Sequence, residues 1–220
     1  MKYKFGFFLL LSLLLSACAA PTLYNNTTEA KPVTMSVPQS TAAAEFACDA
    51  VFFGDSITCD GNFDKLFPVL KVVNLGVYGD TLGDLLRRVP EVKAENPARV
   101  FLLGGINSLR PDNVEECLSQ YVRLLDALKS ACPRARIVVQ SVLPVGAELD
   151  PDGRENEAVR RFNEGLEKLA GEKGCAWANL WAAYEKDSVL DPALTRDGLH
   201  LNFNAYGLWA QAVASYLPSN

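Results

Sequence analysis

The sequence predicts a three-layer α/β/α sandwich built on a five-stranded parallel sheet, and three observations lead to this fold class. Short β-branched or aromatic segments alternate with longer segments of helical period along most of the 220 residues. The segments expected to form strands are almost wholly apolar, as strands buried on both faces of a parallel sheet are. The composition, 49% hydrophobic and 21% charged, is that of a chain with a real core and excludes disorder, collagen and coiled coil for most of its length.

The first 17 residues are typical of a signal peptide rather than of the fold. Lys2 and Lys4 form a basic segment, and the apolar run that follows, residues 5–17, is too short to span a bilayer. The run leads into Leu-Ser-Ala-Cys, which resembles the lipobox of bacterial lipoproteins, so Cys18 is the expected lipidation site. The alternative is an ordinary secretory signal cleaved among the small residues 17–20. In both cases the mature chain leaves the cytoplasm.

Residues 18–45 are rich in Thr, Pro, Asn, Ser and Ala and have no apolar period, so we expect a flexible tether before a single domain at 46–220. Lipid on Cys18 would hold this domain at the bacterial cell envelope, and Ala19 after the cysteine favours the outer membrane. Without lipidation the protein would be secreted. The formal net charge of −5 offers no basic surface for a phosphate backbone, which excludes nucleic acid as a partner. Membrane contact is expected through the lipid anchor only.

Five strands are expected, each from a short run of apolar or β-branched residues. They span residues 50–54, 71–75, 99–104, 136–142 and 175–180. Right-handed crossovers between parallel strands bring all of their carboxyl ends to one edge of the sheet, where such sheets bind ligands. Functional residues are therefore expected just after the strands.

Four helices are expected between and after the strands. They span residues 81–93, 114–131, 156–173 and 204–217. In the first of them Leu82, Leu85, Leu86 and Val89 recur at helical spacing, and the others repeat the pattern. Where the connection between two strands is long enough, it can hold a crossover helix. Such helices can cover both faces of the sheet.

Four segments at the predicted edge carry the candidate functional residues. Gly-Asp-Ser at 54–56 follows the first strand, a glycine-containing run at 74–81 follows the second, and Gly-Gly-Ile-Asn-Ser at 104–108 follows the third. Asp-Gly-Leu-His-Leu-Asn at 197–202 precedes the last helix. Each alone is a common turn sequence. Turn chemistry does not explain why all four occur together at one edge.

The residue types in these segments fit acyl transfer. A serine nucleophile needs a base to take its proton, and the base needs a third group that fixes its tautomer. His200 is the only histidine of the chain, so any imidazole base must be His200. Asp197, three residues earlier, can reach its Nδ1, which leaves Nε2 for Ser56. The alternative is a histidine that is merely satisfied within the core.

An oxyanion formed in such a reaction needs preorganised hydrogen-bond donors. Three candidates lie in the same segments: the backbone N–H of Ser56, the backbone N–H of Gly79 and the side-chain amide of Asn107. A glycine at position 79 lets the backbone approach a substrate closely.

The four segments resemble the blocks of the SGNH hydrolases, also called GDSL lipases and esterases. The resemblance implies that Ser56 is the nucleophile, that Gly79 and Asn107 are oxyanion donors, and that Asp197 and His200 complete the triad. It also implies the flavodoxin-like form of the three-layer sandwich.

Two positions depart from the pattern of that family. Ser108 stands where an aspartate usually follows the block asparagine, and Ile57-Thr58 replaces the leucine of the GDSL block. The second replacement is common in the branches that resemble acetylesterases and platelet-activating-factor acetylhydrolases.

No metal site and no cofactor are expected. The chain has one histidine and no C-x-x-C pair among its six cysteines, and it lacks the glycine patterns of dinucleotide and P-loop sites. G-x-S-x-G is absent as well. The aspartates near the first two strands are interpreted as caps and turns: Asp55, Asp60, Asp64, Asp80 and Asp84.

Five cysteines remain outside the lipobox: Cys48, Cys59, Cys117, Cys132 and Cys175. Cys132 and Cys175 each open a strand expected to neighbour the other, so one disulfide between them is compatible with an oxidising compartment. Cys59 lies outside the four segments and is interpreted as a bystander.

These observations predict an esterase that cleaves carboxylic esters through an acyl-Ser56 intermediate. Little length is left beyond the core elements, so we expect no large lid and an open cleft. Such a cleft suits short acyl esters, such as acetyl esters of carbohydrates. A lysophospholipase or thioesterase of the same family is the alternative. A glycan-binding surface lipoprotein without activity is the alternative from another class, and the complete triad disfavours it.

Overall fold

The computed structural model describes residues 45–150 and 153–218. The signal peptide expected at residues 1–17, the lipidation site Cys18 and the tether as far as residue 44 lie outside the described residues. Within the described part of the chain, no helix combines the length and the apolar character needed to cross a membrane.

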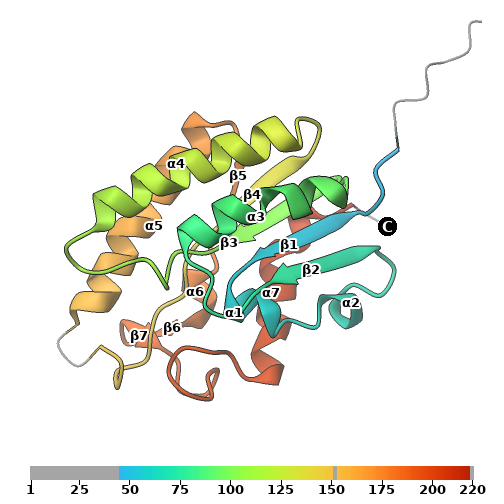
Figure 1. The fold of residues 1–220 in the computed structure, drawn as a ribbon. Helices are drawn as coiled ribbons and strands as arrows, with labels where there is room; N and C mark the ends of the chain where they lie inside the picture. The colour runs from blue at the N-terminus through green and yellow to red at the C-terminus, as the bar shows by residue number, and fades with distance from the viewer. Residues whose placement is uncertain (1–44, 151–152, 219–220) are drawn as a thin grey trace, which may run out of the picture. The chain divides into compact units, whose positions relative to one another are not determined.

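A five-stranded sheet forms the centre of the fold, and every neighbouring pair of its strands is parallel (Figure 1). In chain order its strands are β1 (Ala50–Gly54), β2 (Val72–Gly76), β3 (Arg99–Leu103), β4 (Arg136–Gln140) and β5 (Ala176–Ala178). Their spatial order is β2-β1-β3-β4-β5, so the direction of winding reverses between β1 and β3. The predicted sheet and its number of strands are confirmed.

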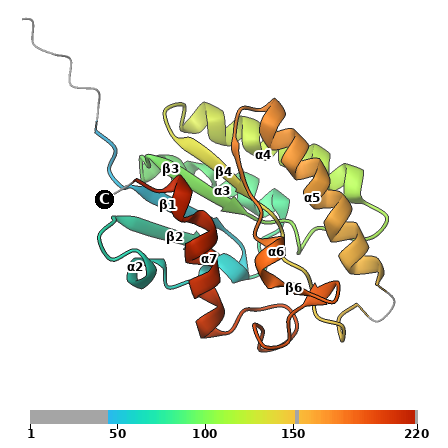
Figure 2. The same cartoon turned by 180° about the vertical axis from the view of Figure 1, so that it is seen from behind.

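Helices cover both faces of this sheet, as Figures 1 and 2 show from opposite sides. One face packs against α3 (Leu82–Ala94), α4 (Val114–Ala131) and α5 (Arg154–Glu172). The other packs against α1 (Ser56–Cys59), α2 (Phe63–Leu66), α6 (Trp181–Tyr184) and α7 (Tyr206–Val213). Successive strand residues point to opposite faces, so Phe53 joins the first core and Phe52 the second. The predicted three-layer sandwich is confirmed.

The strands differ in burial according to their place in the sheet. All residues of β1 are buried, and so are all but the first residue of β3 and of β4. By contrast, β2 is an edge strand whose residues are only partly buried, with Asn74 exposed. The expectation that strands are buried on both faces therefore holds for the inner strands and is wrong for this edge.

Several short elements were not expected. They are α1, α2, α6, the 3₁₀ turns Phe203–Ala205 and Ala214–Tyr216, and the antiparallel hairpin of β6 (Glu185–Lys186) and β7 (Val189–Leu190). Each has two to four residues, which is too few to display a period. The helix expected at 204–217 is accordingly shorter, with α7 enclosed between the two 3₁₀ turns.

The strands expected at 136–142 and 175–180 are longer than the observed ones. In the structure β4 ends at Gln140 and β5 at Ala178, although Val142 and Leu180 beyond these ends are almost fully buried. A run of apolar residues indicates that a segment is buried, and here the buried segments continue into loops that leave the sheet.

All five described cysteines are free thiols, and Cys132 does not pair with Cys175. The strand register explains why the interpretation from neighbouring strands fails. Val138 lies opposite Ala176, so Cys175 lies beside the start of β4. Cys132 caps the end of α4 several residues upstream of that point. Cys132 therefore belongs to the turn before β4 and not to the strand position opposite Cys175, as the prediction had assumed.

Candidate active site

Ser56 lies at the turn from β1 into α1, at the carboxyl edge of the sheet. Asp55 caps the helix in an extended conformation, and its Oδ1 accepts a hydrogen bond from the backbone N–H of Ile57 at 3.0 Å. Gly54 has no room for a side chain, because a Cβ there would collide with the carbonyl oxygen of Leu103. The serine therefore emerges between β1 and β3, where the winding of the sheet reverses and where ligands bind in such folds.

A hydrogen-bonded chain joins Ser56 to His200 and Asp197. The Oγ of Ser56 lies 3.0 Å from Nε2 of His200, and Nδ1 of His200 lies 2.8 Å from Oδ2 of Asp197. The serine and the histidine are separated by 144 positions in the chain, so only the fold brings them together. With its proton on Nδ1, facing the carboxylate, the imidazole has Nε2 as the acceptor toward the serine hydroxyl.

The turn that carries Asp197 and His200 is held largely by its own residues. Oδ1 of Asp197 accepts from the backbone N–H groups of Leu199 at 3.1 Å and of His200 at 2.7 Å. Burial opposes ionisation of this carboxyl, but the hydrogen bonds from His200 and Leu199 outweigh it and lower the pKa of Asp197 to about 2. Asp197 is therefore an anion at any physiological pH.

Thr195 is a supporting residue that the sequence analysis did not single out. Its hydroxyl donates to the carbonyl oxygen of His200 at 2.7 Å and accepts from the backbone N–H of Gly198 at 3.0 Å. Gly198 has a positive φ of 81°, which only glycine adopts easily, so the turn needs a glycine between the aspartate and the histidine.

The three candidate oxyanion donors meet at the same edge. Gly79 has a φ of 77°, and a Cβ at this position would meet nothing within 4 Å, so the glycine is needed for its backbone conformation and the space before it is open. One amide hydrogen of Asn107 is donated to the carbonyl oxygen of Asp80 at 3.0 Å, which leaves the second for another acceptor. Among the described residues, the backbone N–H groups of Ser56 and Gly79 have no acceptor.

Ser108, which departs from the family pattern, has a structural role next to Asn107. Its Oγ accepts a hydrogen bond from the backbone N–H of Leu82, the first residue of α3, at 2.9 Å. The serine thus satisfies one of the free N–H groups at the start of that helix. It ties the loop after β3 to the loop that carries Gly79.

Two further residues that the sequence analysis missed support the loop carrying Gly79. Arg88 on α3 contacts the carboxylate of Asp80 and donates to the carbonyl oxygen of Leu75 at 3.0 Å. Asn74 donates to the carbonyl oxygens of Thr58 and Gly61 and thereby ties α1 to the edge strand. An asparagine within an apolar strand segment was the only signal of this role in the sequence.

A polar cluster borders the triad. The phenol of Tyr78 contacts the carboxylate of Asp60, whose other oxygen accepts from Arg196 at 2.6 Å. The ring centroid of Tyr78 lies 6.2 Å from that of His200, and the side chain of Tyr78 is 57% exposed. Asp60, interpreted from the sequence as a turn residue, is therefore part of the entrance to the site.

Asp55 is the most strongly perturbed carboxyl of this region. It is fully buried, and its Oδ2 has no hydrogen-bond partner among the described residues. Burial raises the pKa of Asp55 to about 7, although the hydrogen bond from Ile57 favours the charged form. The carboxyl directly before the serine thus titrates near neutral pH.

In the described part of the chain, no group of three or more His, Cys, Asp or Glu side chains could hold a metal ion.

Comparison with known proteins finds a matching family model and several similar proteins. The model of the GDSL-like lipase/acylhydrolase family matches residues 52–208. The alpha2 subunit of platelet-activating factor acetylhydrolase IB, in human and in rat, is 28% identical over 129 residues, which are 56% of this chain and 56% of that protein. The chain thus matches these curated relatives over about half of their length.

Solved structures share the fold at lower sequence identity. A protein from Streptococcus pneumonia described as a putative platelet activating factor has a TM-score of 0.68 at 24% identity, over 81% of this chain and 87% of that one. The acetyl xylan esterase AlAXEase has a TM-score of 0.67 at 20% identity, over 77% and 100%. A catalytic mutant of Axe2, an acetylxylan esterase from Geobacillus stearothermophilus, has a TM-score of 0.60 at 21% identity, over 79% and 97%.

Proposed function

The chain belongs to the GDSL-like lipase/acylhydrolase family, and from this premise we propose that it is a serine esterase that removes short acyl groups, above all acetyl, from carbohydrate esters. Membership of this family makes it an esterase-type hydrolase. The observation that carries the proposed mechanism is the hydrogen-bonded chain from Ser56 through His200 to Asp197.

In the first half of the reaction, Ser56 Oγ attacks the ester carbonyl carbon while Nε2 of His200 takes its proton. The tetrahedral intermediate collapses, the alkoxide leaves with the proton from His200, and an acyl-Ser56 ester remains. In the second half the same nitrogen deprotonates a water molecule, which attacks the acyl-enzyme. The second tetrahedral intermediate releases the carboxylic acid while His200 returns the proton to Ser56 Oγ. Asp197 keeps the proton on Nδ1 and stabilises the imidazolium of each step.

The negative charge on the carbonyl oxygen is stabilised by the N–H groups of Ser56 and Gly79 and by the free amide hydrogen of Asn107. Each comes from the end of a different element at the same edge: α1, the loop after β2 and the loop after β3. The loops are tied together by hydrogen bonds, so the donors are in place before the substrate arrives. Loss of one such donor costs about 10²–10³ in rate.

The short-acyl preference is supported by the polar entrance and by the structural neighbours. Tyr78, Asp60 and Arg196 border the triad with hydroxyl, carboxylate and guanidinium groups, which suit a hydroxylated alcohol moiety. Two of the similar structures are described as acetyl xylan esterases. The curated relatives, named as acetylhydrolases, are consistent with a small acyl group.

A lysophospholipase is the second candidate, and one observation favours it. A groove of about 200 Å³ lies between α2 and the turn after His200, and its surface is mainly apolar because of Leu66, Phe203 and Tyr206. Phe203 is 77% exposed, which is unusual for a phenylalanine. An acyl chain is the kind of ligand that such a groove would shield from water.

We also propose that the protein is carried to the bacterial cell envelope and anchored there by lipid on Cys18. The support is the order of basic segment, apolar run and lipobox-like cysteine in the sequence. Replacement of Cys18 by serine, followed by fractionation of the producing cells, tests this: we expect the enzyme to move from the membrane to the soluble fraction. Retention in the membrane fraction would contradict lipid anchoring at Cys18.

The experiment that tests the activity is a series of nitrophenyl esters with acyl chains from two to twelve carbons, together with an acetylated xylooligosaccharide. We expect the highest kcat/KM for the acetyl ester and release of acetate from the oligosaccharide. A preference for long chains would contradict the short-acyl proposal and favour the lysophospholipase. A fluorophosphonate probe should label the native chain and not the Ser56→Ala variant, because labelling needs an activated serine.

A further inference from the structure

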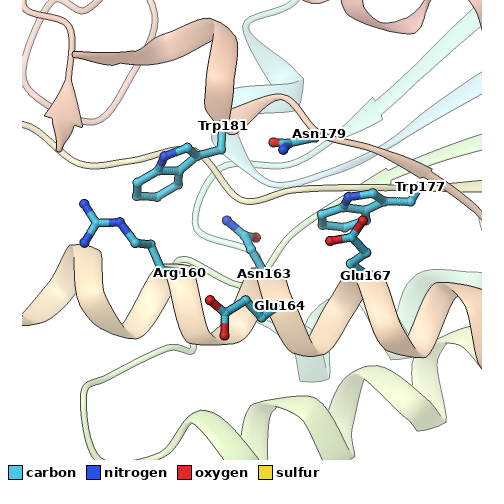
Figure 3. Close-up of a pocket in the computed structure, with 7 residues that line it drawn as sticks. All are labelled: Arg160, Asn163, Glu164, Glu167, Trp177, Asn179 and Trp181. Atoms are coloured by element: carbon cyan, nitrogen blue, oxygen red, sulfur yellow. The ribbon is translucent and has the colours of Figure 1, made fainter. Parts of the chain in front are cut away.

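A pocket apart from the triad lies between α5 and the edge strand β5 (Figure 3). Its cavity measures about 220 Å³ and is lined by Arg160, Asn163, Glu164, Glu167, Trp177, Asn179 and Trp181. Ser56 follows β1, and β5 is three strand spacings away in the sheet, about 14 Å. None of the lining residues belongs to the triad or to the oxyanion donors, so the mechanism does not explain the pocket.

The lining side chains occupy matching positions on the two elements. Residues 160, 163, 164 and 167 follow the i, i+3, i+4, i+7 pattern of one helix stripe. Facing them, Trp177 lies on β5, Asn179 directly follows this strand, and Trp181 is the first residue of α6. Figure 3 shows both indole rings lying over α5, with Asn163 and Glu167 rising from the helix toward them. The pocket thus has an aromatic wall facing a polar floor.

Several polar side chains of the pocket are not used by the fold. In the part of the chain that the structure describes, the side chains of Glu164, Glu167 and Asn179 have no hydrogen-bond or ion-pair partner. Asn163 differs, because its amide is fully engaged with the backbone of Val142 and fixes the floor in position. The pocket therefore offers two carboxylates and one amide that can bind a ligand.

The aromatic wall is held in place before any ligand binds. The guanidinium of Arg160 lies 5.4 Å from the ring centroid of Trp181 and also donates to the carbonyl oxygen of Ser188 at 3.3 Å. The backbone N–H of Trp181 donates to the buried hydroxyl of Ser141 at 2.8 Å. Both tryptophans are only half-buried, so part of each ring is accessible.

The chemistry of the lining selects one class of ligand. An acyl chain would strip water from Glu164 and Glu167 without replacing their hydrogen bonds, which is costly. An anion would be repelled by the same two carboxylates. The place of a cation over the Trp181 ring is already taken by the guanidinium of Arg160. A sugar ring meets all the requirements, because its C–H face packs on an indole while its hydroxyls donate to carboxylates and bond to an amide.

We infer that this pocket binds a sugar unit of a neutral oligosaccharide chain and so holds the glycan at a distance from the ester that Ser56 cleaves. The inference rests on the proposed function in taking the substrate to be carbohydrate-bound. It adds a second site of contact, beside the edge strand β5. A glycan held at both places would bind more tightly than one held at the triad alone, since the second contact is intramolecular.

The test is a titration of the Ser56→Ala chain with xylohexaose and with cellohexaose, followed by tryptophan fluorescence and by calorimetry. The serine variant separates binding from hydrolysis. We expect saturable binding of at least one of the two sugars. Trp181→Ala should weaken it by about tenfold or more, as removal of a central aromatic contact does. The double change Glu164→Gln and Glu167→Gln should also weaken it and leaves the core untouched, which keeps the test valid if Trp181→Ala unfolds.

Glu172→Gln is the matched control, because Glu172 is an exposed carboxylate on the same helix and outside the pocket. It should bind as the Ser56→Ala chain does. Sugar binding that survives in both pocket variants would overturn the inference. A failure of both sugars to bind would overturn it as well. Saturable binding of tetramethylammonium in place of the sugars would overturn the choice of ligand class.

Activity of the unmodified chain toward 4-nitrophenyl acetate is measured in parallel. Cleavage of this ester without sugar binding would refute the inference and leave the esterase proposal standing. Sugar binding without cleavage would refute the esterase proposal and leave the pocket standing.

Discussion

The turn that carries Ser56 and the turn that carries Asp197 and His200 are built in opposite ways. The serine turn is buried and is held by distant parts of the chain: the amide of Asn74 on β2 and the hydroxyl of Tyr206 on α7. The histidine turn is partly exposed, and most of its hydrogen bonds join residues within five positions of one another.

This difference separates chemistry from stability. Changes in the contacts that hold the serine turn should disturb the fold as well as the reaction, because those contacts are part of the core. Changes in the histidine turn should affect the reaction more than the fold, because few core contacts depend on it.

The largest expected effect comes from removing either reacting group. Ser56→Ala and His200→Ala should each lower kcat for 4-nitrophenyl acetate by about 10⁴–10⁶-fold, since either change removes the nucleophile or its only base. The hydroxyl of Ser56 bonds only to His200 among the described residues, so the melting temperature should change little. Substantial activity in either purified, folded variant would contradict the proposed mechanism.

A smaller loss is expected from Asp197→Asn. Asparagine can still accept the backbone hydrogen bonds of the turn, but it favours the wrong tautomer of His200, which in serine hydrolases costs about 10⁴ in kcat. The free energy of unfolding at pH 7 should change far less than the rate. A kcat near that of the native enzyme would show that Asp197 does not orient the histidine.

The two turns should also respond oppositely to pH. The folded state keeps the proton of Asp55 up to about pH 7, whereas the unfolded chain releases it near pH 3.9, so Asp55 should make the protein less stable as pH rises between these values. The pKa of Asp197 is lowered to about 2, so this group stabilises the fold above pH 4 and loses that contribution as pH falls toward 2.

Asp55→Asn tests this contrast in urea unfolding curves measured from pH 4 to 8. The variant should lose the part of the pH dependence that Asp55 causes, on the order of a few kcal/mol between pH 4 and 7. Asparagine can still cap α1, so the fold should persist. An unchanged pH profile would show that Asp55 is ionised in the folded protein.

The smallest effect concerns the packing behind the serine. The hydroxyl of Tyr206 donates to the buried carbonyl oxygen of Ile57 at 2.7 Å. Tyr206→Phe should lower the free energy of unfolding by about 1–3 kcal/mol, because that carbonyl loses its side-chain donor.

In the histidine turn, Thr195→Val should reduce kcat more than it reduces stability. Equal effects of the two changes on stability would remove the distinction between the turns.

The layer architecture, the five parallel strands and the residues that meet in the triad geometry could be predicted from the sequence. Strand and long-helix segments were readable because their apolar period repeats over enough residues, and Asp197 and His200 were readable because their contact is local. His200, as the only histidine, left no other choice of imidazole.

Features that depend on contacts between distant segments could not be predicted from the sequence. The raised pKa of Asp55, the roles of Asn74 and Ser108, and the pocket that joins Trp177 and Trp181 to α5 all arise from such contacts. The spacing of apolar residues along a segment indicates which face of that segment is apolar. Burial, hydrogen-bond partners and cavity lining depend on which other segment covers that face. Elements of four residues such as α1 and α6 are too short to display a period, so they became visible only in the folded protein.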